Sequence, residues 1–589
     1  MQKHPLVLTQ TASQKATSSY EEAAATCRAK VRAIVNECAR LNIKYTDKNF
    51  YLPYLDALVS LDSLDDPPSS VKGLQGVGSV KRVEDIYEEP HFIVDGATAD
   101  DVRQGYVGDC WFLAAITALS GKKDLIERIC VDRDEKVGVY GFVFFRDGEW
   151  ISEIVDDTLC LKRSDDQRHQ YDILRLPKDF RESLRKGSNS LYFASCRESN
   201  ETWLPLLEKA YAKVHGDYQA ISGGFAGEGI EDLTGGASTY ITSETVLDKD
   251  KLWSELMQVN KDSGFLFGCG SRVGRDNDPH DEEGFVRGHA YTVLSAREVK
   301  DPIDESKTLR LLKVRNPWGR QEWNGAWSDG SKEWNAKMIQ ELEHTFGDDG
   351  IFWISFQDWL KYFPDFERTR LFGPEWTVTQ QWTSANVPWN TDYLDATFKF
   401  TLAKDGPVVL VLSQPDSRYF SGLQGRFRYS LHFRLYKEGE DTYIVRSMLQ
   451  TGSGRSCSAE LDLEQGEYFV RIKIEASRYD CSTAEEIIKK YRFQRRDKLL
   501  AVGKNFDLPH SKGRLREREN QNVVDRKTTT REEDKAELKR QRIYKKKERE
   551  RERARQRRID AETKRKEEIK KAAKKKEKEE AEAKKAAEK

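Results

Sequence analysis

The sequence predicts an α+β protein, in which a helix-first main domain is followed by an all-β domain and a charged tail. Residues 110–119 form an apolar run of helical length, whereas residues 137–155 alternate like two strands joined at Asp147-Gly148. Between residues 376 and 476, short strand-like segments alternate with turn signals, a pattern typical of an antiparallel β-sandwich. Residues 531–589 contain too few apolar residues to build a core.

Length and composition limit the class of protein. A chain of 589 residues is too long for one hydrophobic core, and an aromatic content of 11% supplies the large side chains that disordered chains lack. The nine cysteines are scattered without a CxxC pair, which indicates reduced thiols rather than a zinc cage or a redox motif. The sequence shows neither a signal peptide nor an apolar window long enough for a transmembrane segment, so we expect a soluble protein that is cytoplasmic, with a nuclear location also compatible.

Pro and Gly clusters and shifts of composition divide the chain into regions. Clusters at 65–70 and 73–78 separate an N-terminal helical region from the main domain. The expected organisation is an N-terminal amphipathic helical region at 1–50, a linker at 51–79, a main domain at 80–368, an all-β domain at 369–500 and a charged tail at 501–589.

The first long helix is predicted over residues 19–41, where apolar residues recur every three or four positions. It can pack on the main domain of its own chain, or it can bind a partner, and the sequence does not separate these readings. The stripe consists of Tyr20, Ala24, Cys27, Val31, Ile34, Cys38 and Leu41.

The tail is basic, whereas the rest of the chain is acidic. Residues 531–589 hold 26 Lys and Arg against 16 Asp and Glu, although the whole chain has a net charge of only −1. Such a segment forms an isolated charged helix, a coiled coil or a disordered extension. It is either a solvated extension or an arm for an acidic partner such as nucleic acid, microtubules or acidic lipid.

The segment QGYVGDCWFLAA carries the strongest chemical signal in the chain. A Gly-rich turn leads into a helix that begins at Cys110, where the positive end of the helix dipole stabilises a thiolate. Gln104, six residues earlier, can turn its side-chain amide toward an oxyanion formed when a thiolate attacks a carbonyl. A cysteine at a helix start is by itself more often a small buried hydrophobic residue.

Two downstream segments supply the partners that a nucleophilic cysteine needs. His289 in GHAYTV precedes a strand and would take the thiol proton, later returning it to a leaving amine. Asn316 in VRNPWG follows another strand and would fix the imidazole tautomer, while Trp318 would shield that hydrogen bond from water. Together with Cys110 these residues form a Cys/His/Asn set.

These blocks resemble the calpain family closely. QGYVGDCWFLAA, GHAYTV and RNPWG match the catalytic blocks of the calpain core in type, order and spacing, and WLPLLEKAYAKVHGDYQAISGG followed by EDLTGG looks like the segment between Cys and His. The resemblance covers residues 80–368. It implies a papain-like core in two subdomains, about 80–245 with the Cys and 246–368 with the His and Asn, which calcium brings into register.

The resemblance also implies two calcium sites in the core. The first maps onto the carbonyls of Val94 and Gly96 and the carboxylates of Asp101 and Glu201, which match the family in type. The second maps onto Glu322, Asp329 and Asp349, with the Gly347 carbonyl. Because Ile351 stands where conventional calpains carry another acidic residue, we expect weak or absent calcium binding at the second site.

Several features depart from conventional calpains. Arg320 and Gln321 replace an acidic and an apolar residue, residues 164–189 form a longer polar stretch, and the acidic loop 275–283 is expected to be a solvated rim. No EF-hand pattern follows the predicted sandwich, so the chain resembles non-EF-hand calpains of fungal or protist type, and we expect no small subunit.

The function that follows is calcium-dependent limited proteolysis of protein substrates by an intracellular cysteine endopeptidase, through a thioester acyl-enzyme. The alternative is a catalytically inert scaffold that binds partners through the sandwich, the N-terminal helix and the basic tail. Retention of Gln104, Cys110, His289 and Asn316 favours the enzyme.

Overall fold

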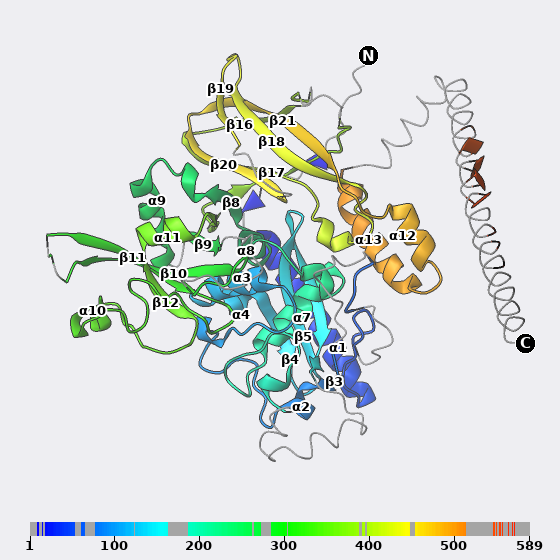
Figure 1. The fold of residues 1–589 in the computed structure, drawn as a ribbon, viewed down its shortest axis with the longest axis horizontal. Helices are drawn as coiled ribbons and strands as arrows, with labels where there is room; N and C mark the ends of the chain where they lie inside the picture. Colours follow the sequence, from blue (N-terminus) through cyan, green and yellow to red (C-terminus); the bar gives the residue numbers. More distant parts are fainter. Residues whose placement is uncertain are drawn as a thin grey trace, which may run out of the picture. The chain divides into compact units, whose positions relative to one another are not determined.

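The computed structural model divides into two compact units, Met1–Gly513 and Arg514–Lys589. Helices and strands are mixed along the first unit (Figure 1). The structure describes residues 9–10, 14–15, 18–52, 60–64, 77–122, 124–162, 186–261, 264–271, 284–302, 304, 306–387, 392–394, 397–447 and 454–513, with scattered positions between 543 and 571.

The first half of the main domain is built around helix α3 (Cys110–Ser120), which confirms the helix predicted there. Every residue from Trp111 to Leu119 is buried, as expected for an apolar run that is packed on all sides. Phe112 stacks on Tyr211 of α7 (Trp203–His215), with ring centroids 3.7 Å apart. Gly229 of α8 (Ala226–Thr234) lies so close to Ala115 that a side chain would not fit.

A three-stranded antiparallel sheet, β4-β5-β6, lies beside these helices. The turn between β5 and β6 is the predicted Asp-Gly turn, since Asp147 and Gly148 have φ of 47° and 82°. A separate two-stranded antiparallel sheet in this half consists of β3 and β7. The strand bounds are β3 (Ser79–Arg82), β4 (Cys130–Asp134), β5 (Val139–Arg146), β6 (Glu149–Asp156) and β7 (Thr158–Leu161).

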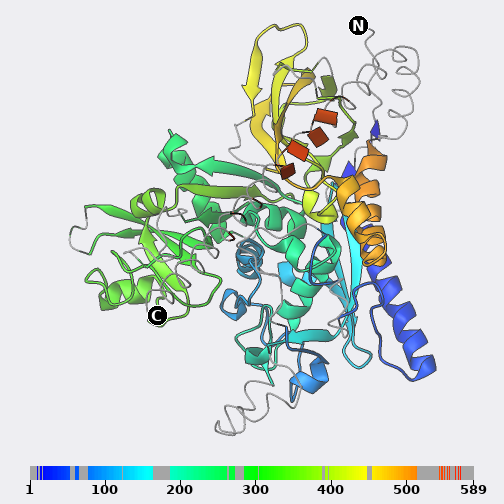
Figure 2. The same cartoon turned by 45° about the vertical axis from the view of Figure 1, so that its right-hand side comes forward.

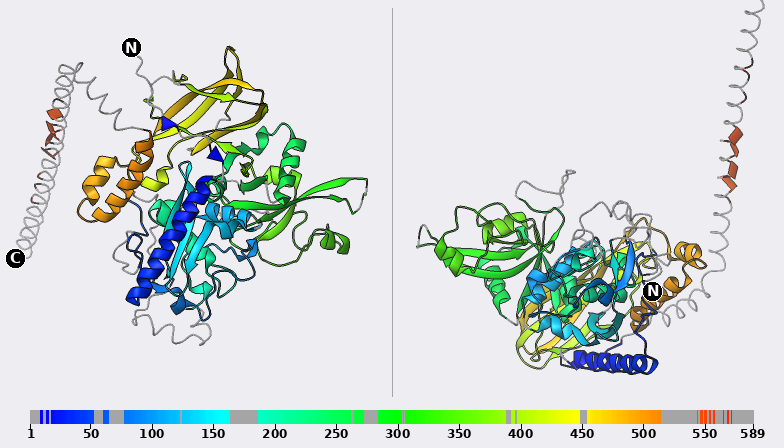
Figure 3. Two further views of the ribbon diagram at one scale, coloured as in Figure 1. Left: turned by 180° about the vertical axis from the view of Figure 1, so that it is seen from behind. Right: turned by 90° about the horizontal axis from the view of Figure 1, so that it is seen from below.

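The N-terminal helix α1 (Ser18–Leu41) lies across this sheet, as the view from behind shows (Figure 3). Most of its predicted stripe faces the strands, and Ala24, Cys27 and Val31 form one apolar cluster with Val139 and Val143 of β5. Leu41, the last predicted position of the stripe, is instead exposed at the end of the helix. Of the two readings left open by the sequence, the structure therefore supports packing on the main domain. Short strands of the same region, β1 (Thr9–Gln10) and β2 (Gln14–Lys15), pair with β15 (Gln381–Trp382) and β14 (Thr377–Val378).

The second half of the main domain is a six-stranded antiparallel sheet in the order β12-β11-β10-β9-β13-β8. Helices α9 (Lys249–Leu256) and α11 (Phe356–Tyr362) join its apolar cluster through Trp253 and Trp359. Helix α10 is Ala336–Glu341. The strands are β8 (Ala237–Thr242), β9 (Phe265–Gly270), β10 (Ala290–Lys300), β11 (Thr308–Arg315), β12 (Ile351–Ser355) and β13 (Asp365–Arg370).

The two halves meet where the start of β10 lies against α3. The Thr292 hydroxyl donates to the carbonyl of Ala114 at 2.6 Å, and both groups are buried. Figure 2 shows the halves side by side, the first in blue and cyan and the second in green. This junction places the residues that precede β10 next to the beginning of α3.

After the main domain come two antiparallel sheets, β16-β21-β18-β19 and β17-β20. They share an apolar layer in which Phe433 and Ile472 of the larger sheet lie with Leu410 and Cys457 of the smaller one. The predicted assignment to the calpain-type β-sandwich remains a prediction. The bounds are β16 (Thr397–Leu402), β17 (Gly406–Ser413), β18 (Phe427–Lys437), β19 (Tyr443–Arg446), β20 (Ser456–Leu463) and β21 (Gly466–Arg478).

Two helices follow the last strand, α12 (Ala484–Tyr491) and α13 (Arg496–Lys512). Helix α13 returns to the first half of the main domain, where Lys498 forms an ion pair with Asp217 and donates to the Gly216 carbonyl at 2.7 Å. The boundary predicted at residues 500 and 501 falls inside this helix. Residues 501–512 therefore pack with the first unit rather than belonging to a free tail.

Several predicted segments lie outside the described residues: 65–70, most of 73–78, most of 164–189, all of 275–283 and most of the tail. In the second unit, the described positions from Ile543 to Lys571 are helical. Within the predicted linker 51–79, Leu61 and Leu64 are buried in the main core. None of the described helices combines the length and the apolar character that crossing a membrane requires.

Candidate active site

Cys110 is the first residue of α3, and Asp109 is the N-cap residue. The amides of Phe112 and Leu113 donate to the Asp109 carbonyl at 2.9 and 3.0 Å, so the helix starts directly at the thiol. Burial raises the pKa of Cys110, the backbone of Ala290 opposes that shift, and the charge of Asp109 adds to it. The thiol is therefore protonated at neutral pH and needs a base before it can attack.

The glycines of the turn before Cys110 are required by close packing against the protein itself. A Cβ on Gly105 would overlap the backbone of Phe193, and one on Gly108 would lie 2.8 Å from the Ser222 hydroxyl. The turn is thus held between two neighbouring segments.

Asp109, the residue before the nucleophile, is one of a pair of buried carboxyl groups. Asp109 and Glu208 of α7 are both fully buried and contact each other, and the second oxygen of Glu208 accepts from the Ala194 amide at 3.0 Å. Burial raises the pKa of both carboxyls. Because two carboxylates in contact cannot both ionise in such a place, the pair shares a proton at neutral pH.

His289 and Asn316 come together from the ends of two neighbouring strands. His289 immediately precedes β10 and Asn316 immediately follows β11, and His289 Nε2 lies 2.8 Å from Asn316 Oδ1. The Trp318 ring covers this contact, with its centroid 4.8 Å from that of the imidazole. Burial lowers the pKa of His289 to about 4, partly offset by the hydrogen bond to Asn316. The imidazole is therefore neutral near pH 7.

The hydrogen bonds of Asn316 determine which imidazole nitrogen is the base. Its Nδ2 donates to the carbonyls of Arg320 and Gln321, both at 3.0 Å, and its Oδ1 accepts from the Trp318 amide at 3.0 Å. The orientation of the amide is therefore assigned by its partners. Since Oδ1 can only accept, Nε2 of the neutral imidazole carries the proton and Nδ1 keeps the free lone pair. Arg320 and Gln321 therefore act here through their backbone carbonyls.

The nucleophile and the base belong to different halves of the main domain. The backbone of Ala290, one residue after His289, lies close enough to Cys110 to lower the pKa of its thiol. Among the described residues, no hydrogen bond joins the Cys110 sulfur to the His289 ring. Catalytic hydrogen bonds of this kind are often long or poorly aligned before substrate binds.

Gln104 lies on the turn between the two halves. Its backbone amide donates to the Pro317 carbonyl at 3.2 Å, next to the Asn316 turn, and its Nε2 donates to the Val107 carbonyl at 2.9 Å. A primary amide has two N–H donors, so the contact with Val107 does not exhaust Nε2. The second N–H of this amide is the donor from which an oxyanion would accept a hydrogen bond.

The residues of the first predicted calcium site lie together. Glu201 is fully buried, its Oε1 accepts from the Val94 amide at 2.8 Å, and its Oε2 has no well-formed hydrogen bond although Cys196 and Trp203 lie close by. Burial raises the pKa of Glu201 to about 7, and the nearby charge of Asp101 adds to the shift.

The chemistry of this first set fits calcium. Asp95 and Gly96 have φ of 54° and 93°, so the loop that carries the Val94 and Gly96 carbonyls is sharply bent. An unpartnered buried carboxylate oxygen, a second carboxylate and loop carbonyls are the donors that calcium prefers. Among the described residues, no group of three or more Asp, Glu, His or Cys side chains already has metal-binding geometry.

The residues of the second predicted site also cluster, but protein groups occupy their oxygens. Glu322 Oε1 accepts from the amides of Asp349 and Gly350 at 2.9 and 2.8 Å. Asp329 contacts the His344 ring at 2.8 Å and the Gly347 amide at 2.8 Å. Burial raises the pKa of Glu322 to about 7, with the charges of Asp329 and Asp349 adding to the shift. This set fits calcium less well than the first.

An arginine that the sequence reasoning missed joins the first set to the Asn316 turn. Arg315 is buried, and its guanidinium donates to the Asp100 carboxylate at 2.7 Å and to the carbonyls of Asp100 and Val102 at 3.1 and 3.2 Å. Asn316, which follows Arg315, and Asp101, which follows Asp100, are both candidate site residues. The motif VRNPWG contains Arg315, but its partner 215 positions away could not be read from it.

Comparison with known proteins identifies the family. The model of the calpain family cysteine proteases matches residues 62–369, more than half of the chain. The chain belongs to the calpain family of cysteine proteases. Glu208, which the sequence reasoning also missed, lies within the stretch WLPLLEKAYAK already noted as calpain-like.

Individual calpains resemble this chain over its main domain and somewhat beyond. The calpain-type cysteine protease DEK1 of Zea mays is 34% identical over 365 residues, which is 59% of this chain and 15% of that protein. The calpain-1 catalytic subunit of Bos taurus is 34% identical over 327 residues, 54% of this chain and 41% of that protein. The match thus spans less than half of either relative.

Proposed function

We propose that this calpain is a calcium-dependent cysteine endopeptidase that cleaves protein substrates at a limited number of bonds. The observation that carries the proposal is the contact of 2.8 Å between His289 and Asn316, beside the Trp318 ring, in a chain whose Cys110 begins helix α3. A buried imidazole of fixed tautomer beside a cysteine at a helix start suits thiol catalysis. Family membership supports peptide hydrolysis.

In the proposed reaction, Nδ1 of His289 takes the proton of the Cys110 thiol as its sulfur attacks the scissile carbonyl carbon. The C–N bond then breaks, the leaving amine receives the proton from His289, and a thioester remains on Cys110. Water, deprotonated by the same imidazole, attacks this thioester and releases the carboxylic acid with regeneration of the thiol.

Charge that develops on the substrate oxygen would be stabilised by the Gln104 side-chain amide and the backbone amide at the start of α3. The positive end of the helix favours the thiolate over the thiol, which offsets part of the cost of burial. Trp318 excludes water from the His289–Asn316 contact, so that the imidazolium formed in the reaction keeps its orientation.

Calcium would be held by the Val94 and Gly96 carbonyls together with Asp101 and Glu201. When bound, it supplies positive charge that offsets the repulsion between these two carboxylates. Arg315 connects this loop to Asn316, so an ordered loop favours the position of the Asn316 turn. The second set is proposed to bind calcium weakly or not at all.

The test is cleavage of a fluorogenic peptide by the full chain, with calcium or with a chelator. We expect turnover that needs calcium and that Cys110→Ala abolishes. Turnover by Cys110→Ala would overturn the nucleophile, and full activity under strong chelation would overturn the calcium requirement. Irreversible labelling of Cys110 by an epoxide inhibitor separates an enzyme from an inert scaffold, because such reagents need an activated thiolate.

A further inference from the structure

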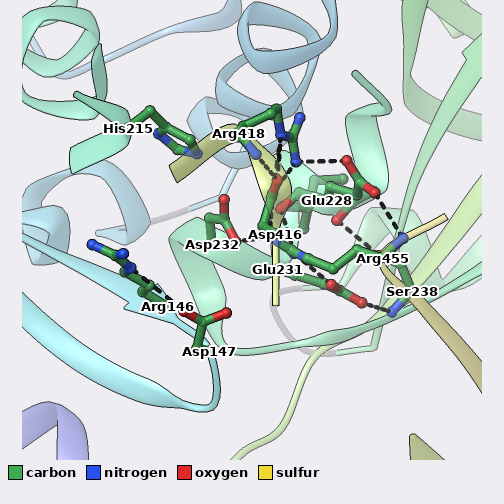
Figure 4. A network of polar contacts seen from close by, with 12 residues as sticks. Arg146, Asp147, His215, Glu228, Glu231, Asp232, Ser238, Asp416, Arg418 and Arg455 are labelled. Carbon is green, nitrogen blue, oxygen red and sulfur yellow. Dashed lines mark hydrogen bonds and ion pairs between the residues drawn. The ribbon is translucent and has the colours of Figure 1, made fainter. Parts of the chain in front are cut away.

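A buried cluster of charged side chains lies where residues that follow β17 and precede β20 meet helix α8 (Figure 4). Three carboxylates fall within five residues of this short helix, at Glu228, Glu231 and Asp232. Burying several like charges in one turn requires cations at close range. These come from beyond the main domain, as Arg418 and Arg455.

Arg455 contacts the carboxylates in a forked arrangement. Its guanidinium lies 2.6 Å from Asp232 and 2.6 Å from Glu231, and it also donates to the Glu228 carbonyl at 3.1 Å. These contacts neutralise charge on α8. They do not extend to α3.

Arg418, on the 3-10 turn η7 (Ser417–Phe420), reaches further. Asp416, two residues before Arg418, accepts hydrogen bonds from Nε of Arg418 at 3.0 Å and from Nη2 at 2.5 Å. These contacts orient the arginine side chain toward the main domain. Nη2 then donates to Glu228 at 2.6 Å. The other terminal nitrogen, Nη1, is buried without a hydrogen bond.

The guanidinium of Arg418 lies over the indole of Trp111, with its central carbon 4.4 Å from the ring centroid. Gly224 provides the room, since a Cβ at that position would overlap both Arg418 and Trp111. A guanidinium can cover a ring face and donate hydrogen bonds in its own plane at the same time, whereas the ammonium of a lysine is a point charge.

Trp111 connects this contact to the nucleophile. It follows Cys110 directly, is fully buried, and its Nε1 donates to the Ile221 carbonyl at 2.9 Å. Two residues later, the Gly223 amide donates to the Gly108 carbonyl at 2.9 Å. The segment that touches Trp111 therefore also holds the turn that leads into Cys110.

We propose that Arg418 is a positioning residue of the protease site, supplied by the region after the main domain, which fixes Trp111 and through it the place of the Cys110 thiol. This deepens the proposed function and rests on the assignment of Cys110 as the nucleophile. The C-terminal sheets then contribute to catalysis through one side chain.

Neutralisation of Glu228 alone does not explain these contacts. Asp416 already pairs with Arg418, so neutralising charge does not require the guanidinium to lie over Trp111. The position of the guanidinium over the ring and the space left by Gly224 both concern the indole.

The test uses the full chain with Arg418→Lys, which keeps the charge but removes the planar fork. Cys110 is alkylated with iodoacetamide from about pH 6 to about pH 10, and the modified peptide is quantified by mass spectrometry. Rates are normalised to the folded fraction. We expect the alkylation rate constant of Cys110 to fall about tenfold and kcat to fall by the same factor, because the thiol is displaced. KM should stay within about twofold of the wild-type value, because the substrate contacts remain.

The matched control is Arg455→Lys, which loses a fork in the same cluster without a contact to Trp111. It is expected to lower stability but to leave the alkylation profile of each folded molecule as in the wild type. A wild-type profile in Arg418→Lys, or an equal loss in both variants, overturns the proposal.

Gly224→Ala provides a second variant if Arg418→Lys does not fold. It keeps every charge and fills the space that Arg418 and Trp111 share, so the same loss of Cys110 reactivity is expected, and an unchanged rate contradicts the proposal. Alkylation needs no turnover. If the wild-type chain cleaves no peptide, the proposed function fails, while the ratio of alkylation rates still tests the positioning role.

Discussion

Nε2 of His289 lies 2.8 Å from Oδ1 of Asn316, and the amide of Asn316 is oriented by the carbonyls of Arg320 and Gln321. These three residues thus determine the tautomer of the His289 imidazole. The neutral imidazole is left with a single free lone pair at Nδ1, the one suited to accept a thiol proton.

Asn316→Ala should lower kcat by about 100-fold with little change in KM, since proton transfer by a positioned base contributes a factor of that order. The hydrogen bond to Asn316 raises the pKa of His289, so its loss makes the imidazole a weaker base as well as a mobile one. Steady-state kinetics on a fluorogenic peptide measures the effect.

Trp318→Phe keeps an aromatic face over His289 and should lower kcat by less than about tenfold. A larger loss in Trp318→Phe than in Asn316→Ala contradicts this account.

Glu201→Gln should weaken calcium binding by about 100-fold, because a ligand should matter at least as much as the groups that merely orient ligands. Titration calorimetry of the full chain with calcium measures binding without reliance on activity. Glu322→Gln, from the second set, is the matched comparison and should change the binding little. Equal losses in both variants would show that the second set also binds.

Glu367→Gln should make the protein more stable at alkaline pH. Burial, followed by the charges of Glu228 and Asp365, raises the pKa of Glu367 to about 8. The folded state then keeps a proton that the unfolded chain releases, so the free energy of unfolding falls as pH rises from the ordinary carboxyl range through about 8. Glutamine cannot ionise, and the variant should lack this decline.

Urea unfolding at about pH 4.5 and about pH 8 measures the difference. We expect the advantage of Glu367→Gln over the wild type to grow with pH by a few kcal/mol. The exposed Glu341→Gln serves as the control and should leave the pH dependence unchanged. If the free energy of unfolding falls with pH as steeply in Glu367→Gln as in the wild type, the group that keeps the proton in the folded state is not Glu367.

Gly141→Ala should loosen helix α1 from the sheet. A Cβ on Gly141 of β5 would lie 2.6 Å from the Cys27 sulfur and 2.7 Å from a Val31 methyl carbon, so the helix must shift. Overpacking of this kind costs about 1–3 kcal/mol. Thermal unfolding and faster proteolysis within residues 18–41 would report it.

The control is Gly406→Ala, since no atom lies within 4 Å of a Cβ at that strand position. Its effect should stay within about 0.5 kcal/mol. Unchanged proteolysis of α1 in Gly141→Ala would show that the helix does not depend on this contact.

Local patterns in the sequence determined much of this protein. The apolar run after Cys110 predicted α3, and the stripe through Cys27 and Val31 predicted which face of α1 is buried, because side chains three or four positions apart share one face of a helix. His289 before a strand and Asn316 after another were predicted as partners from their motifs and the family resemblance.

Only the tertiary structure decided which distant groups complete the site. Arg315 with Asp100, Asp109 with Glu208, and Arg418 on Trp111 join positions roughly 100 to more than 300 residues apart, and no local period encodes such pairs. Their physical reason is compensation: a buried charge or carboxyl must find a partner, and the packing of whole elements determines which partner is within reach. The sequence was therefore enough to predict Cys110 as the nucleophile, whereas only the fold shows which distant groups hold it in place.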